Sequence, residues 1–389
     1  MVQSLHEERS AAGRPAVAPP QPKGTRLVSL DAFRGLTIAG MLIVNNPGSW
    51  GAIYAPLRHA EWHGWTPTDL IFPFFLFIVG VSMSYSFAVQ MSRGAERPGI
   101  ARRAAKRAAI IFLLGLFLHA FPNFLDLSDL RIPGVLQRIA IAFLCATPIV
   151  LWLGLRGRAV AISTLLLGYW ALQTLTTVPG QGPSLLEPGA DLGAWIDRTV
   201  FGTRHLWSQS RTWDPEGLLS TLPAIGTVLL GSLVGDWLRS GREQLEKVVG
   251  LFVAGSAGLV LGLAWDAVFP INKPLWTSSY VVFTAGMACH TLAICYWLID
   301  VRGRKKWATP FVVFGTNAIA AFFLSSLFAR VIVMVRVGGN VPLKTWIYQN
   351  LLASWLSPVN ASLAFALLYT TLWLAAMSVL YRRRIFIKV

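Results

Sequence analysis

The chain has 389 residues, of which 54% are hydrophobic and only 13% are charged. The mean hydropathy is +0.55, which excludes an ordinary soluble protein, because about a quarter of the residues in such proteins are charged. The formal net charge of +16 does not indicate nucleic-acid binding. The Lys and Arg residues are spread over short segments between apolar runs instead of forming one basic surface.

Residues 1–26 are rich in Ala, Pro, Arg and Glu and contain no apolar core. We expect a disordered cytoplasmic tail with no cleavable signal peptide. The remainder, residues 27–389, is predicted to form one transmembrane domain.

Apolar runs recur along this domain, each near the roughly 20 residues that cross a bilayer as a helix. The fold class is therefore predicted to be all-α, a polytopic membrane helix bundle with about ten transmembrane helices. The segment 107–121 is short for a full span, so we expect it to tilt or to rely on its neighbours. The predicted helices cover residues 28–46, 68–91, 107–121, 133–154, 158–176, 217–238, 247–269, 277–299, 307–334 and 359–381.

The loops between these helices differ in charge. Most of the 34 Lys and Arg residues fall in the N-terminal tail, in every second loop and in the C-terminal segment. Because cytoplasmic loops are enriched in Lys and Arg, this alternation predicts that both termini are cytoplasmic. The other loops include a long one at 177–216 and the segment KTWIYQNLLASWL, which we expect to lie on the membrane as an interfacial helix.

Charged groups at the inner face point to an anion site, because charge inside a bilayer is costly without a function. Asp31 and Arg34 are three residues apart in SLDAFRG and can pair on one face of a helix. The pair serves either to position the helix or to let Arg34 hold an anionic ligand. Arg103 and Arg107 are the other candidates on this side.

The outer ends of the first two helices carry the candidate catalytic residues. Asn45 can cap its helix or bind a ligand. His59 is either a surface histidine or a general base, since neutral imidazole accepts protons near neutral pH. Asp69 can cap its helix or orient the imidazole. His63 is four residues after His59, but the pattern is not HExxH and no third ligand is evident, so no metal site is predicted.

Other polar and aromatic residues complete the candidate site. Arg138 and Asn317 are polar groups within apolar segments, and we assign both to cofactor binding. Asp214 and Glu216 precede a helix in DPEG; capping accounts for one carboxylate, and the second suggests a polar ligand. Because aromatic faces pack well on sugar rings, Trp62 and Trp276 join them as candidate substrate-binding residues.

This layout suits an acyl donor such as acetyl-CoA at the inner face and an amino sugar at the outer face. A sugar or anion permease could present the same groups, and it would be expected to have broken helices near the membrane midplane. An acyltransferase that modifies hydroxyl groups of envelope glycans is the other alternative.

Several motifs resemble those of the heparan-alpha-glucosaminide N-acetyltransferase family and its bacterial relatives. They occur in the same order as in that family and extend from about residue 26 to the end of the chain. The matching stretches are LDAFRG, VNNPG, HAEWHGWTPTDLIFPFFLFIVG, RIPGVLQRIA, IDR…FG…HLW, DPEGLLST, NKPLWTSSYV and PF…GTNAI.

The resemblance implies transfer of an acetyl group from cytoplasmic acetyl-CoA to the amine of a glucosamine on the other membrane face. It maps the active-site histidine onto His59 and the nearby asparagine onto Asn45. It is also compatible with a homodimer in a bacterial inner membrane. Animal members carry a long lumenal N-terminal domain that this sequence lacks, so we expect a small amino sugar or an envelope saccharide as acceptor.

The resemblance leaves the order of events open. His59 either deprotonates the amine for direct transfer, which we favour, or forms a covalent acetyl-histidine. Asn45 is expected to donate a hydrogen bond to the developing oxyanion, a contribution of about 3 kcal/mol.

Overall fold

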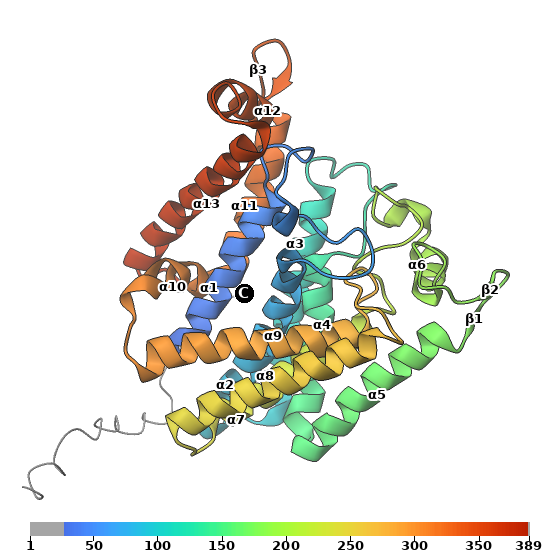
Figure 1. Cartoon of the computed structure of the whole chain (residues 1–389), viewed down its shortest axis with the longest axis vertical. Coiled ribbons are helices and arrows are strands. Elements are labelled where there is room, and N and C mark those ends of the chain that lie inside the picture. Colours follow the sequence, from blue (N-terminus) through green and yellow to red (C-terminus); the bar gives the residue numbers. More distant parts are fainter. Residues whose placement is uncertain (1–26, 388–389) are drawn as a thin grey trace, which may run out of the picture.

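The computed structural model describes residues 27–387, which form a helical bundle with two short antiparallel hairpins (Figure 1). The predicted tail at 1–26 lies outside the described residues. The hairpins are β1–β2 (Thr177–Val178, Gly182–Pro183) and β3–β4 (Arg336–Val337, Val341–Pro342). The helices are α1 (Val28–Asn45), α2 (Ile71–Ser92), α3 (Arg97–Ala120), α4 (Val135–Trp152), α5 (Leu155–Thr174), α6 (Leu192–Phe201), α7 (Thr221–Arg239), α8 (Gln244–Asp266), α9 (Ser278–Tyr296), α10 (Thr309–Thr316), α11 (Ala318–Met334), α12 (Leu343–Trp346) and α13 (Pro358–Arg382).

Every apolar segment predicted as a helix contains one, which confirms the all-α membrane bundle. Among the described residues, seven helices are long and apolar enough to cross a membrane, or eight if the bent pair α10–α11 is one span. The predicted count of about ten spans is therefore not confirmed, since α3 and α5 fall outside this set. The expected interfacial segment is helical as well, because α12 continues into a turn at Ile347–Leu352.

Helix α3 begins ten residues before its predicted start at residue 107. Pro98 lies in its first turn, where proline is favoured because its missing N–H needs no partner. The first half of α3 carries Arg102, Arg103 and Arg107. A search for apolar runs therefore missed this half, and the prediction of a short third helix was wrong.

The single helix predicted at 307–334 is broken. Helices α10 and α11 meet at Asn317 at an angle of 72°. Asn317 is 1% exposed, and its amide donates to Ile385 O at 3.0 Å and accepts from Ile387 N at 2.8 Å. The C-terminal segment thus occupies the bend and supplies polar partners there, as non-helical backbone inside a membrane bundle requires.

Glycines allow the helices to approach each other closely. A Cβ on Gly80 of α2 would lie 1.9 Å from Val228 O of α7, and one on Gly35 of α1 would lie 1.6 Å from Phe311 O of α10. Small residues at such crossings let backbones make direct contact, which stabilises helix pairs in membranes. These contacts fix α1 against the bend and α2 against α7.

We expect Gly35→Ala to destabilise the protein by about 1–3 kcal/mol, the usual effect of overpacking. The clash is with backbone, which cannot rotate away. At Gly168 in α5, no heavy atom lies within 4 Å of the position that a Cβ would take, so Gly168→Ala is the matched control and is expected to be neutral or slightly stabilising. Thermal unfolding in detergent measures both. Equal losses in the two variants would contradict the role of the close contact.

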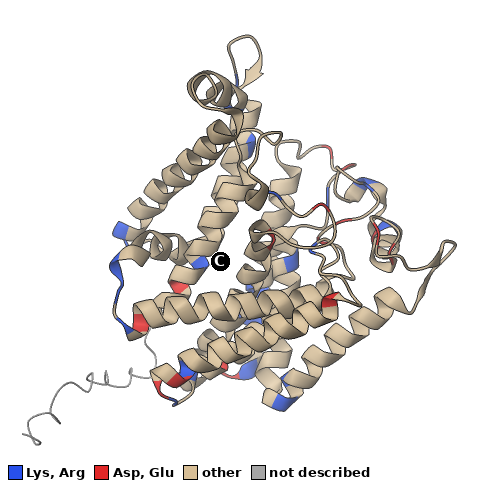
Figure 2. Ribbon diagram, viewed as in Figure 1, with Lys and Arg blue, Asp and Glu red and all other residues tan. Residues whose placement is uncertain are grey.

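The two ends of the bundle differ in character (Figure 2). We call one the loop-rich end; it carries the loops 46–70, 121–134, 175–220 and 267–277, joined by bonds such as Gly64 N to Ile271 O at 2.7 Å and Ile132 N to His205 O at 3.0 Å. The other is the basic end, where the short loops 93–96, 240–243 and 302–308 lie. Helix interiors contain few charges, as Figure 2 shows.

Candidate functional site

A histidine, a carboxylate and a lysine meet at the loop-rich end. His59 Nδ1 lies 2.6 Å from Asp69 Oδ1, so the predicted partnership of these two residues is present. Lys273 Nζ lies 2.9 Å from His59 Nδ1, 3.3 Å from its Nε2 and 3.5 Å from Asp69 Oδ1. The His59 side chain is 48% exposed, whereas that of Asp69 is 1% exposed. A buried carboxylate therefore supports an imidazole that a ligand can reach.

Asp69 is held in place by its own turn. It lies in the short helix Pro67–Leu70, which Thr66 caps. Its Oδ2 accepts from the backbone N–H groups of Ala60 and Thr66, both at 3.0 Å. The second predicted role of Asp69, helix capping, is thus also present, and one oxygen performs each role. Because Oδ1 can only accept from a protonated nitrogen, Nδ1 of His59 is the donor and Nε2 keeps its lone pair.

The loop that carries Lys273 is bonded to the loop that carries His59. Asn272 donates to Trp62 O at 3.0 Å, and Gly64 N donates to Ile271 O at 2.7 Å. Tyr280 in α9 donates to the backbone carbonyl of Asp69. These bonds join segments more than 200 residues apart and fix the lysine beside the imidazole.

Two opposing effects act on the pKa of Lys273. Burial lowers the pKa of its amine, and the negative charges of Asp69 and Glu216 counteract this. Its side chain is 19% exposed. Trp62, in the loop of His59, packs against Trp213 at 5.0 Å, so the His59 site adjoins the acidic segment ahead of α7.

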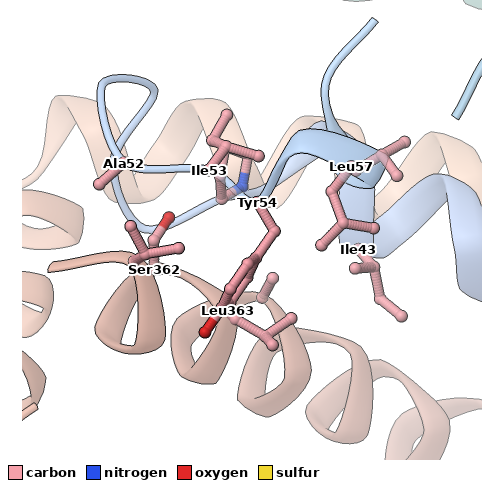
Figure 3. A pocket seen from close by; sticks show the side chains of 11 residues that line it. Ile43, Ala52, Ile53, Tyr54, Leu57, Ser362 and Leu363 are labelled. Atoms are coloured by element: carbon pink, nitrogen blue, oxygen red, sulfur yellow. The ribbon is translucent and has the colours of Figure 1, made fainter. Parts of the chain in front are cut away.

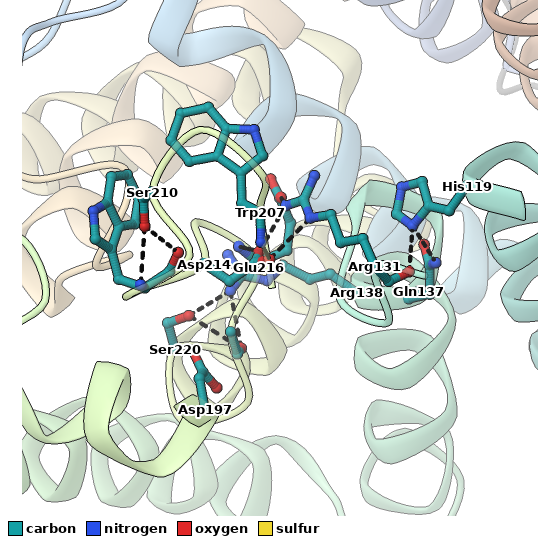
Figure 4. A network of polar contacts seen from close by, with 12 residues as sticks. His119, Arg131, Gln137, Arg138, Asp197, Trp207, Ser210, Asp214, Glu216 and Ser220 are labelled. Atoms are coloured by element: carbon teal, nitrogen blue, oxygen red, sulfur yellow. Dashed lines mark hydrogen bonds and ion pairs between the residues drawn. The ribbon is translucent and has the colours of Figure 1, made fainter. Parts of the chain in front are cut away.

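Arg131 forms ion pairs with that acidic segment (Figure 4). Arg131 donates to both oxygens of Asp214, at 2.9 and 2.6 Å, and to Glu216 at 2.6 Å. The side chains of Asp214 and Glu216 are 0% and 9% exposed. Both carboxylates predicted to bind substrate thus have a structural partner, and their substrate role stays a prediction.

Tryptophans surround the site in two different ways. Trp62 packs edge-on against Trp213 at 5.0 Å, and Trp213 packs against Trp207 at 5.2 Å. All three are half-buried, so each offers part of its surface. Trp276 is 1% exposed and is enclosed by neighbours that include Phe72. Trp62 thus offers aromatic surface and Trp276 offers almost none, and the substrate role of both stays a prediction.

A second group of carboxylates lies beneath the tryptophans. Asp191, Asp197 and Asp214 line a small pocket together with Tyr169 and Trp213. Burial raises the pKa of Asp197 to about 7, partly opposed by a hydrogen bond from the backbone of Leu218. Asp191 is bonded within the pocket, to Gln173 and the backbone of Ala194.

Asn45 is not hydrogen-bonded to this cluster. It is the last residue of α1 and is exposed, and its side chain makes no hydrogen bond to any residue in the described range 27–387. The neighbouring pocket lies between Ile43, Tyr54 and Leu363 (Figure 3) and is lined mostly by apolar side chains. It contains neither Asn45 nor His59, so the role of Asn45 stays a prediction.

The residues assigned to the donor fall into two places. Arg34 pairs with Asp31 at 2.9 Å, as predicted, and also donates to Ser82 at 2.7 Å and to Gly315 O at 3.1 Å. The Arg107 guanidinium lies over the Phe143 ring, 5.5 Å from its centroid. Arg103 donates to Gln90 at 3.0 Å near the basic end.

Arg138 lies elsewhere. It is 1% exposed, donates to Gly217 O at 3.1 Å and to Ser220, and stacks over Trp276 at 5.1 Å. It therefore belongs to the loop-rich end, away from Arg34. Asn317 bonds the C-terminal segment at the bend. The assignment of both residues to the donor stays a prediction.

Lys273 and Arg131 were not predicted as site residues. Lys273 was visible as the one cation in PINKPLW, a short loop between two apolar segments, and Arg131 as the first residue of RIPGVLQR. Neither of these two stretches indicates which residues its cation contacts in the fold. Within residues 27–387, no group of three or more His, Cys, Asp or Glu side chains is arranged to hold a metal ion.

Comparison with known proteins gives consistent matches. The family model described as "Heparan-alpha-glucosaminide N-acetyltransferase, catalytic" matches residues 26–255. The human protein named heparan-alpha-glucosaminide N-acetyltransferase is 28% identical over 94% of this chain, and the mouse protein of that name is 29% identical over 94%. The chain spans 60% of the length of each relative.

Proposed function

Because the chain belongs to the heparan-alpha-glucosaminide N-acetyltransferase family, we propose that it is a membrane N-acetyltransferase. In this proposal acetyl-CoA donates from the cytoplasmic side, and the acceptor is the amine of glucosamine or of a glucosamine-containing saccharide on the other side. The basic end faces the cytoplasm, in keeping with the positive-inside rule. The contact between His59 and Asp69 carries the proposal.

The His59 site suits proton transfer from an amine. Asp69 holds Nδ1–H, which leaves the lone pair of Nε2 to take the proton as the amine nitrogen bonds to the acetyl carbon. The carbon–sulfur bond then breaks, and the CoA sulfur takes the proton from Nε2 and leaves as the thiol. The exposed half of the imidazole gives the acceptor access, and Trp62 with its two tryptophan neighbours offers aromatic surface for a sugar ring.

In this proposal, Arg34 and Arg107 bind the phosphates of the donor. Arginine binds phosphate through its planar set of N–H donors. Arg34 also donates to the carbonyl of Gly315, one of the last carbonyls of α10, so it supports the bend at the same time. The donor would thus be held where α1, α3 and the break at Asn317 come together.

We expect Arg107→Met to weaken acetyl-CoA binding at least about 10-fold, the loss of roughly one charge-assisted hydrogen bond. Binding of a short acetyl thioester that lacks phosphates should not change. Isothermal titration with both donors measures this, and Arg302→Met at the exposed loop is the control. Equal weakening for both thioesters would mean that Arg107 supports the fold and not the phosphates.

The function is tested with purified protein in detergent, by transfer of label from acetyl-CoA to glucosamine. Labelled N-acetylglucosamine would support the proposal. Donor binding without labelling of any amino sugar would reject the acceptor, and label on a hydroxyl group would favour the O-acetyltransferase. Absence of donor binding would overturn the proposal.

One observation favours the permease as second candidate, namely the 72° break at Asn317. Broken helices form substrate sites in many transporters. Reconstituted vesicles distinguish the two functions, because a permease accumulates intact labelled sugar and an acetyltransferase releases CoA. Family membership and the His59–Asp69 pair support the enzyme.

A further inference from the structure

The amine of Lys273 is in direct contact with the imidazole of His59. Its Nζ is within 3.3 Å of both ring nitrogens. The shorter of the two contacts, 2.9 Å, is with Nδ1, the nitrogen beside Asp69. Lys273 therefore places a positive charge beside the ring whose Nε2 takes the proton in the proposed reaction.

The two neighbours of His59 act on its charge in opposite directions. A carboxylate 2.6 Å from Nδ1 favours a protonated, positive imidazole, and a protonated imidazole cannot act as a base. A positive charge about 3 Å away opposes a second positive charge. Interactions of this kind shift protonation equilibria by about one unit or more. Lys273 thus offsets the effect of Asp69.

Other charged groups near Lys273 support its ammonium form. Asp69 is within 3.5 Å, and Glu216 attracts it from the segment ahead of α7. Arg131 pairs with Glu216 and reduces this attraction. His63, whose Nδ1 is 3.3 Å from the amide of Asn272, is the other titratable group at this loop.

We propose that Lys273 is a positioning residue for catalysis, an inference that rests on the proposed function. Its ammonium keeps the His59 imidazole uncharged, so that Nε2 is a base at neutral pH. Without this charge, Asp69 would hold His59 as an imidazolium until the pH rises further. The lysine forms no covalent bond in this role.

The test follows the protonation of His59 directly. Protein labelled in its six histidines is titrated by NMR in detergent without substrates, and His59→Gln identifies the His59 signal. We expect Lys273→Met to move the midpoint of His59 protonation upward by about one pH unit. Lys273→Arg, which keeps the charge, should stay near wild type, as should Lys344→Met. Lys273→Gln repeats the neutral substitution if the Met variant aggregates.

Acetyl transfer is measured on the same preparations against pH. If the acid limb of kcat/KM moves upward with the NMR midpoint in the neutral variants alone, both proposals hold. If the midpoint moves but wild type acetylates no amine, the electrostatic role of Lys273 stands and the proposed function fails. A midpoint unchanged in both neutral variants overturns the inference, even where transfer is lost.

Discussion

Replacing His59 by Ala is expected to lower the rate of acetyl transfer by about 100- to 10,000-fold, the range that a positioned general base contributes. The reason is that Nε2 would no longer take the proton of the attacking amine, and no other imidazole within residues 27–387 lies against Asp69. Binding of acetyl-CoA should be retained, because the arginines proposed to hold its phosphates lie elsewhere. Initial rates with labelled donor and a binding titration measure the two effects.

His63→Ala is the matched control for this prediction. His63 is exposed; its Nδ1 is 3.3 Å from the Asn272 amide, and its ring packs edge-on against Trp62 at 6.3 Å. We expect this variant to keep its rate within a factor of about ten, since it removes no group in contact with His59 or Asp69. Equal losses in the two histidine variants would contradict a single base and would revive a joint role of the pair. Parallel double-reciprocal lines, with both substrates varied, would count against direct transfer.

Replacing Arg131 by Met is expected to destabilise the loop-rich end by about 3–5 kcal/mol, the usual cost of leaving buried charges without their partner. Arg131 is the ion-pair partner of Asp214 and Glu216, whose side chains are almost fully buried. The loss should appear as a lower thermal unfolding midpoint in detergent, together with weaker acetyl transfer, because Glu216 also attracts Lys273.

Arg211→Met provides the matched control. Arg211 pairs with Asp129 at 3.5 Å, and both side chains are about half exposed. Exposed pairs contribute at most about 1 kcal/mol, so this variant should unfold close to wild type. Adding Asp214→Asn and Glu216→Gln to Arg131→Met should recover part of the loss, since it removes the unpaired charges. Similar unfolding midpoints for the two single arginine variants would contradict the stabilising role of the Arg131 ion pairs.

Local properties of the sequence predicted the helices well. Apolar runs of sufficient length give helices wherever the chain enters a membrane, because the backbone must satisfy its own hydrogen bonds there. The pairing of Asp31 with Arg34 also follows from local spacing, as does capping by Asp69 in its turn. The eight motifs, in their order along the chain, indicated the family.

Contacts between distant segments were beyond prediction from one sequence. The break at Asn317 depends on Ile385 and Ile387, whose backbone groups bond its amide. The basic first half of α3 was not predicted, because helices can extend beyond the apolar run that identifies them. The burial of Trp276 arises from packing against Phe72 and Arg138.

The sequence by itself determined the membrane bundle, its helices and the candidate base His59, since each follows from composition or from residues close in the chain. Only the tertiary structure decided that Lys273, 214 residues away, lies against that base, and that Arg131 neutralises two carboxylates. The physical reason is that charges act through space over a few ångströms. Their effect on a histidine depends on how the loops pack and not on their distance along the chain.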